Sequence, residues 1–331
     1  MITHRERLET CIANGPLDRV PVALWRHFPV DDQTPSSLAA AALAFQRAFD
    51  FDLVKVTPES SFCIKDWGAQ DVWRGATEGT REYTHWVIRQ PEDWAKLPLL
   101  NPEAGHLSAQ LECLRLLYRE LGANTPMIQT IFSPLHQAKN LVGPANLLVH
   151  IRRYPDAVKA GLAIIAESTR RFIECARHTG IAGVFYAVNH AQYGVFSPAE
   201  YQEFGTFYDL QVLEPANDLW LNMLHLHGTQ IFFDHFLDYP VKIINWHDRE
   251  TSPSLVQAKH LYSGVLCGGL QRERTMVLAS PEQVQEEAQD AILATGGKRF
   301  ILGTGCVLPI TAPYGNLLAA RRVVEPGYSP A

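Results

Sequence analysis

The sequence predicts an α/β fold, a single (β/α)8 barrel, on three observations. First, eight short apolar or β-branched runs are spread along the chain: 20–24, 53–56, 126–131, 183–187, 221–225, 241–246, 264–268 and 300–303. Second, helical patterns separate these runs, including 36–48, 107–121, 155–179, 198–217, 281–295 and 313–324. Third, Ser197 and Ser280 are good helix caps. Strands that alternate with helices pair in parallel, and eight such units close into a barrel.

An open doubly wound sheet is the rival fold. It predicts a glycine-rich phosphate turn after the first strand, and Trp25–Pro29 does not provide one. At 331 residues the chain is long for one domain, but barrels of this kind reach that size. We therefore expect one domain over residues 1–331, with an excursion at about 62–90, rich in Trp, Tyr and Gly, near the barrel mouth.

Composition narrows the class of protein. The net charge is −6, and basic residues are scattered rather than merged into a stripe, so we expect no nucleic-acid partner. Apolar runs fall far short of the ~20 residues of a membrane span, and the first residues are too polar for a secretory signal. The six cysteines contain no Cys-x-x-Cys pair and are expected to be free thiols. The sequence predicts a cytoplasmic protein that acts on a small molecule and has no membrane partner.

Polar residues that follow the strands are the candidates for function, because barrel chemistry lies at the C-terminal strand ends. Six of the 13 histidines fall there: 27, 136, 190, 225, 227 and 247. His225 and His227 are two residues apart in an extended segment, so both can point to one side and meet one ion. Cys306, after the last strand, can add a thiolate, and zinc favours such a set. The alternative is a pair of structural histidines bonded to the backbone.

Further candidates each allow two interpretations. Arg26 either anchors a substrate carboxylate or forms a salt bridge that closes the barrel. His247 and Asp248 are either an acid/base pair or a hydrogen-bonded pair that lines the barrel. Tyr186 is either a donor at the mouth or a wall residue. Glu59 follows the second strand and is the remaining catalytic candidate.

On these residues the chain resembles the uroporphyrinogen decarboxylase superfamily, which includes decarboxylases and corrinoid- or thiol-dependent methyltransferases. The resemblance runs from Arg5–Leu8 and Asp18–Val22 to Gly305–Leu317. The last stretch matches, without a gap, the Gly-Cys-x-x-Pro-x-x-x-Pro-x-x-Asn-Leu motif of the zinc methyltransferases. In that branch the cysteine binds zinc together with a His-x-Cys-Gly segment, for which this chain has His225-Leu-His227-Gly.

The resemblance implies a zinc-dependent methyltransferase with His225, His227 and Cys306 as metal ligands, completed by His247 or Glu59 when no substrate is bound. The methyl donor would be a methyl-corrinoid or a methylated small molecule, and a corrinoid protein is the expected partner. The sequence does not identify the donor or the acceptor, and it leaves open whether the chain forms a homodimer.

Two alternatives remain. A tetrapyrrole decarboxylase, a lyase, would use Arg26 and Glu59 without zinc. However, Asn140 and Thr304 stand where that branch has a tyrosine and a histidine, so we expect little or no conversion of uroporphyrinogen. The other alternative is a non-catalytic module that binds a corrinoid or a porphyrin.

Overall fold

The computed structural model describes residues 2–325 and 327 and contains eight parallel strands in a nearly closed barrel. In sheet order these strands are β1 (Val22–Ala23), β10 (Phe300–Thr304), β9 (Val265–Leu270), β8 (Ile243–Trp246), β7 (Met223–Leu226), β6 (Gly183–Val188), β5 (Met127–Phe132) and β2 (Val54–Val56). Asp52 bridges the remaining gap between β1 and β2. Its backbone N–H donates to the Val22 carbonyl (2.8 Å), and its carboxylate accepts from the Val22 N–H (2.7 Å). The predicted (β/α)8 barrel is confirmed.

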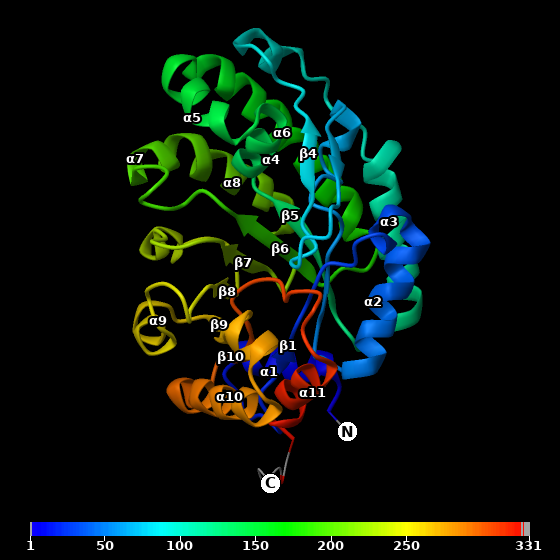
Figure 1. The fold of residues 1–331 in the computed structure, drawn as a ribbon, viewed down its shortest axis with the longest axis vertical. Coiled ribbons are helices and arrows are strands. Elements are labelled where there is room, and N and C mark those ends of the chain that lie inside the picture. The colour runs from blue at the N-terminus through cyan, green and yellow to red at the C-terminus, as the bar shows by residue number, and fades with distance from the viewer. Residues whose placement is uncertain (1, 326, 328–331) are drawn as a thin grey trace.

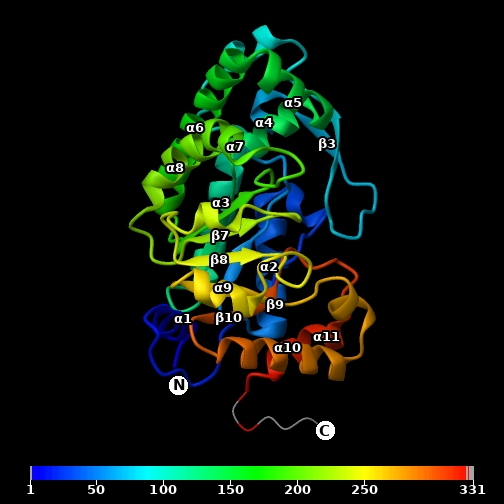
Figure 2. The ribbon, with the colours of Figure 1, turned by 90° about the vertical axis from the view of Figure 1, so that its left-hand side faces the viewer.

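Helices surround the strands, with α2 and α3 on one side and α10 and α11 at one end (Figure 1; Figure 2 gives the perpendicular view). Their bounds are α1 (His4–Ile12), α2 (Pro35–Phe49), α3 (Gly105–Leu121), α4 (Pro134–Val142), α5 (Pro144–Arg153), α6 (Pro155–Arg177), α7 (Pro198–Tyr201), α8 (Phe207–Leu213), α9 (Leu255–Leu261), α10 (Pro281–Thr295) and α11 (Tyr314–Arg322). Within the described part of the chain, no helix combines the length and hydropathy of a membrane span.

The helix predicted over 198–217 is not regular. A wider π-helical turn, Gln202–Thr206, separates α7 from α8, and a 3-10 turn, Glu214–Ala216, follows. Gly205 lies in the wide turn, where a Cβ atom would come within 2.6 Å of the Tyr201 ring. The wider turn accommodates this ring against the helix backbone, which the apolar periodicity does not predict.

Alternation along the strands sorts the barrel into two layers. Trp25, Phe185 and Met223 belong to an inner core enclosed by the strands. Their sequence neighbours Leu24 and Leu224 face the helices in an outer core. Because the side-chain period of a strand is two, neighbouring residues at a strand end face different environments. This parity decides which residues reach the barrel mouth.

A hairpin of β3 (Gln70–Val72) and β4 (Glu82–His85) leaves the barrel after β2 and is drawn in light blue in Figure 1. The loop between its strands is held to the segment after β10, where the Ile310 N–H donates to the Thr77 carbonyl at 2.7 Å. On its β4 side, Arg81 pairs with Asp32 at 2.7 Å. These contacts hold the hairpin against the loops at the C-terminal ends of the strands.

Candidate metal centre

Three imidazoles and one thiol converge at the C-terminal end of the barrel. The Cys306 sulfur lies 3.6 Å from His225 Nε2 and 3.6 Å from His227 Nδ1. His247 Nε2 lies 3.4 Å from His227 Nδ1. One potential ligand atom from each of the four residues lies within 4.8 Å of all the others. The structure therefore brings together the three predicted metal ligands and adds His247 to them.

The sequence positions these residues by strand parity and by one glycine. His225 and His227 are two residues apart at the end of β7, so both face inward. His247 directly follows β8, and Cys306 follows β10. Gly305 lets the two loops approach, because a Cβ atom at this position would come within 2.6 Å of the Trp246 carbonyl oxygen. Any larger residue would push the Cys306 loop away from His247.

Asn245 fixes the orientation of His225. Its amide nitrogen donates to the carbonyls of Cys267 (2.9 Å) and Thr304 (3.0 Å), so its Oδ1 is left to accept. That oxygen lies 2.7 Å from His225 Nδ1, which must then be the protonated nitrogen. The Nε2 lone pair of His225 consequently points towards Cys306. A partner of this kind behind a histidine is characteristic of metal sites.

Electrostatics favour a thiolate at Cys306. Burial by itself raises the pKa of the Cys306 thiol, but the neighbouring His225, His227 and His247 together lower it by more. The net result is a Cys306 pKa well below the usual range. Burial lowers the pKa of His225, which keeps its imidazole neutral. A thiolate beside a neutral imidazole is the protonation state that a metal requires of its ligands.

His247 is buried, but it contacts an exposed carboxylate. Its Nδ1 lies 3.3 Å from Glu250 Oε2, and Glu250 is exposed. Burial lowers the pKa of His247, but hydrogen bonding to Cys306 and the charges of Cys306 and Glu250 raise it further, so the net shift is upward. In the structure His247 therefore contacts Glu250, and Asp248, its expected partner, bonds to Gly269. This arrangement suits a group that takes up a proton and passes it outward.

A cavity of about 120 Å³ lies beside the cluster. Its lining residues come from the strand ends and from the hairpin: Trp25, His27, Lys55, Thr57, Pro58, Ser60, Glu78, Thr80, Thr130, Phe132, His136, Phe185, Ala187, Asn189, His225, His227, Cys306 and Val307. Three of the four cluster residues thus face a space that can hold a small ligand.

Arg26 and Tyr186 do not line this cavity. The Arg26 guanidinium lies over the rings of Phe28 and Phe45, at 5.3 and 5.6 Å from their centroids. The Tyr186 hydroxyl donates to Asp209 at 2.6 Å in the outer core. Both residues have the outward parity of their strands, so neither is brought to the cluster. Tyr186 is a wall residue of the outer core. Arg26 forms no salt bridge within the described residues and donates to the Ile310 carbonyl at 3.2 Å.

Asp248 and Glu59 are also engaged elsewhere. Both Asp248 oxygens accept from the Gly269 N–H at 3.1 Å, and burial raises the pKa of this carboxyl to about 7. Glu59 pairs with Lys65 and accepts from Gln33 at 2.9 Å. His247 and Glu59 were the two residues expected to complete the metal site. His247 belongs to the cluster, and Glu59 does not.

Three residues of the site were missed among the sequence-based candidates: Lys55, Asn245 and Glu250. Lys55 lies inside β2, where a charged residue between two valines was a visible signal. Asn245 is directly paired with His225 across β7 and β8, a register that the sequence does not specify. Glu250 belongs to the polar run after β8, in which position alone does not separate it from Asp248.

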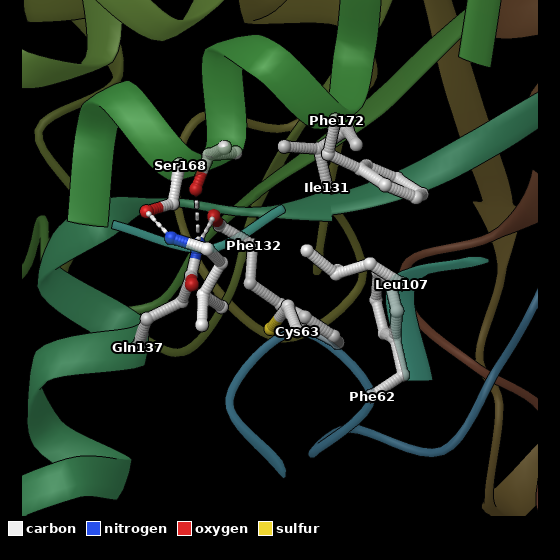
Figure 3. Close-up of a pocket in the computed structure, with 10 residues that line it drawn as sticks. Phe62, Cys63, Leu107, Ile131, Phe132, Gln137, Ser168 and Phe172 are labelled. Carbon is white, nitrogen blue, oxygen red and sulfur yellow. Dashed lines mark hydrogen bonds between the residues drawn. The ribbon is translucent and has the colours of Figure 1, made fainter. Parts of the chain in front are cut away.

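A second, smaller void lies between β5 and helices α3 and α6 and is apolar on most sides (Figure 3). Cys63 lines it, and burial raises the pKa of this thiol. Gln137, the polar side chain on one wall, donates to Thr169 at 3.0 Å and to the Phe132 carbonyl at 2.8 Å. A thiol with a raised pKa among apolar side chains is a feature of core packing, in contrast to Cys306.

The donor set fits a zinc ion. Nitrogen and sulfur ligands at about 2.0–2.3 Å from one tetrahedral zinc lie about 3.3–3.8 Å apart. The distances of 3.4 and 3.6 Å within the cluster fall in that range. Cys306, His225 and His227 could supply three ligands to one ion, and His247 could supply a fourth.

The barrel and the cluster together define a class: (β/α)8-barrel proteins with a histidine–cysteine cluster at the C-terminal mouth. The chain belongs to the uroporphyrinogen decarboxylase (URO-D) family, whose profile matches residues 3–325. The resemblance predicted from the sequence is thereby confirmed.

Two solved structures share the fold across nearly the whole chain. A methyltransferase from Methanosarcina mazei is 17% identical, with 97% of this chain and 98% of that chain covered and a TM-score of 0.85. A B12-independent methionine synthase from Shewanella sp. W3-18-1, in complex with selenomethionine, is 13% identical, with 91% and 93% covered and a TM-score of 0.60. A comparison with curated protein sequences gave no match.

Proposed function

We propose that the protein is an enzyme, a zinc-dependent methyltransferase that moves a methyl group from a corrinoid or a small methylated donor to a thiol. The observation that carries the proposal is the convergence of His225, His227, His247 and Cys306 beside a cavity. The name of the Methanosarcina mazei neighbour and the family membership support methyl transfer. All six cysteines are free thiols among the described residues, which is compatible with the reducing environment of the cytoplasm.

His225, His227 and Cys306 would hold the zinc, since their ligand atoms face one another and Asn245 orients His225. When bound, zinc lowers the pKa of a thiol and keeps the thiolate in place for attack. His247 would take the proton of the acceptor thiol and pass it to solvent through Glu250. The cavity walls hold the acceptor and exclude water from it.

The reaction requires no reactant beyond the methyl donor and the acceptor thiol. The acceptor S–H bond gives its proton to His247, and the sulfur electron pair forms a new bond to the methyl carbon. The bond between methyl and donor breaks, and its electron pair stays with the donor. A corrinoid donor would therefore leave as the cob(I) form. A donor too large for the cavity needs to present only its methyl group at the mouth, as a corrinoid protein partner would.

The decarboxylase alternative has less support. An apolar cavity of about 150 Å³ holds one benzene molecule, so about 120 Å³ is far too small for a tetrapyrrole. Arg26 and Glu59, the residues that this activity would use, contact other groups. Thr304 donates its hydroxyl to the Cys306 carbonyl at 2.6 Å and is fully buried. We expect no substantial conversion of uroporphyrinogen.

Methylcobalamin and a small thiol test the proposal. The zinc-loaded protein should convert methylcobalamin to demethylated cobalamin, which absorbance measured under anaerobic conditions detects. It should also form a thioether, which mass spectrometry detects. Cys306→Ser should abolish both signals, and Cys175→Ser, a thiol on the distant helix α6, should leave them unchanged. If wild type and Cys306→Ser are equally inactive with several donors and acceptors while zinc binds, a binding module is the better description. Uroporphyrinogen turnover by wild type would favour the decarboxylase.

A further inference from the structure

Lys55 is a buried cation in the cavity of the metal cluster. It lies in the middle of β2, is 6% exposed and lines the cavity. Its ammonium group makes one hydrogen bond, to Thr57 Oγ1 at 3.3 Å, and lies 4.6 Å from the centroid of the Phe185 ring. An ammonium taken out of water at this depth needs an anionic partner, because its desolvation is costly.

Within the described part of the chain, that partner is missing for Lys55 and present for the neighbouring cations. Lys65 pairs with Glu59, Arg81 with Asp32, and Arg272 with Glu78. For Lys55, burial lowers the pKa to about 7, and the one charge that favours its ammonium form is Cys306. With zinc on Cys306, the thiolate charge is shared with the metal, so Lys55 has still less compensation.

Three residues that line the same cavity each carry a neutral polar atom with no hydrogen-bond partner among the described residues. These are His27 Nδ1, His136 Nδ1 and Asn189 Oδ1, all buried. Burial lowers the pKa of His27 to about 3, so its imidazole is neutral near pH 7. Buried polar atoms are rarely left unpaired in a native protein unless a ligand or water meets them. The cavity therefore presents to a ligand one amine, which an anionic group would keep protonated, and several neutral hydrogen-bonding atoms.

Size and charge restrict what can meet these groups. A cavity of about 120 Å³ has room for a ligand of about five or six non-hydrogen atoms. A zinc ion with one thiolate ligand carries one net positive charge, and Lys55 adds a second when an anionic ligand keeps it protonated. A ligand with a thiolate for the metal and one acidic group for Lys55 neutralises both.

We propose that Lys55 binds the anionic group of the acceptor and so determines specificity for a small thiol that carries one carboxylate or similar oxyanion. The acid group pairs with the Lys55 ammonium at the side of β2, and the sulfur reaches the metal cluster. The assignment of the sulfur end rests on the proposed function, whereas the acid end rests on Lys55 alone.

Calorimetry with matched ligands tests this assignment. We would titrate 3-mercaptopropionate and its neutral analogue 3-mercaptopropanamide into the zinc-loaded protein at pH 7. A charge-assisted hydrogen bond should make the acid bind about ten- to a hundredfold more tightly than the amide. Lys55→Met, which removes the charge and keeps an unbranched side chain, should bind both with similar affinity. Lys242→Met, at an exposed lysine, should keep the preference.

Equal binding of acid and amide by wild type, or a preference retained in Lys55→Met, would overturn the proposal. Replacing a buried unpaired ammonium by Met is expected to preserve folding, which circular dichroism and thermal melting would verify. A zinc-free arm separates this inference from the proposed function. Even if no zinc binds, propionate should bind more tightly than propanamide, and Lys55→Met should lose that difference. No difference in that arm would exclude Lys55 as an anion site.

Discussion

Two groups of buried polar side chains lie on opposite faces of the barrel strands, and they differ in how far they are satisfied. On the outer face, Asp209 accepts hydroxyl hydrogen bonds from Tyr186 (2.6 Å), Tyr201 (2.7 Å) and Tyr239 (3.1 Å). Every partner in this group comes from the chain itself. We call it the Asp209 cluster.

On the inner face, His225, His227, His247 and Cys306 contact one another at 3.4–3.6 Å, with potential ligand atoms turned to a common centre. Contacts of this length match the spacing of ligands on one ion. The comparison teaches that burial and perturbed pKa values do not by themselves mark function. The outer group is satisfied within the fold, and the inner group is the one for which we propose a metal ion as partner.

The largest expected effect concerns the Asp209 cluster. Asp209→Ala leaves three buried tyrosine hydroxyls without their acceptor, so the free energy of unfolding should fall by about 3–5 kcal/mol. Urea denaturation of the zinc-free protein measures it. Zinc affinity of the folded variant should stay that of wild type. A loss below about 1 kcal/mol, or a parallel loss of zinc affinity, would remove the distinction between the two groups.

The pH dependence of stability gives the next largest effect. Burial raises the pKa of Asp209 to about 6 from 3.8, although the three tyrosine hydrogen bonds lower it. Well below pH 3.8 this carboxyl is protonated in both the folded and the unfolded state. As the pH rises towards 6, mainly the unfolded state loses the proton, so this group lowers the free energy of unfolding by about 3 kcal/mol, with no further change above that. Asp209→Asn lacks this decline. The difference in the free energy of unfolding between wild type and Asp209→Asn, measured from pH 4 to 7, therefore isolates the contribution of the Asp209 carboxyl. A difference that does not change with pH would contradict the raised pKa.

Much of the fold and part of the site could be predicted from the sequence. The eight strand-like runs were sufficient for the barrel because strands and helices differ in their hydrophobic period. His225, His227 and Cys306 were found because same-side spacing is a local property and because the motif around Cys306 matches without a gap. The structure brings these three together.

The candidates that lie elsewhere were selected by position after a strand and not by parity. Trp25 and His27 line the cavity, and Arg26 between them does not; the same holds for Tyr186 between Phe185 and Ala187. This alternation was present in the sequence. The pairing of Asn245 with His225 could not be predicted from the sequence, because the stagger between neighbouring barrel strands depends on the closure of the whole sheet.

Asn245 provides the third prediction, an effect on the metal through a residue that does not touch it. Asn245→Ala removes the acceptor of His225 Nδ1 and should weaken zinc binding about 10- to 100-fold. Competition with a chromophoric chelator measures the affinity. Asn316→Ala is the matched control, since Asn316 is a buried amide that bonds to carbonyls of the segment before α10. Equal zinc affinity in the two variants would mean that Asn245 does not orient a ligand.

The smallest effect is expected at Asp248. Asp248→Asn keeps an oxygen for the Gly269 N–H, so the contact that Asp248 makes is preserved. Zinc affinity, and its pH dependence, should match wild type because Asp248 is outside the cluster. A shifted pH profile for zinc binding would restore Asp248 as the partner of His247.

Zinc titration of the metal-free protein, run beside Cys306→Ser and Cys175→Ser, tests the central claim most directly. Wild type and Cys175→Ser should bind about one zinc per chain with the same affinity. Cys306→Ser should bind more than about a hundredfold more weakly, because it loses the thiolate that faces His225 and His227. Equal affinity in all three proteins, or no stoichiometric binding in any of them, would contradict the assignment of this cluster as a metal centre.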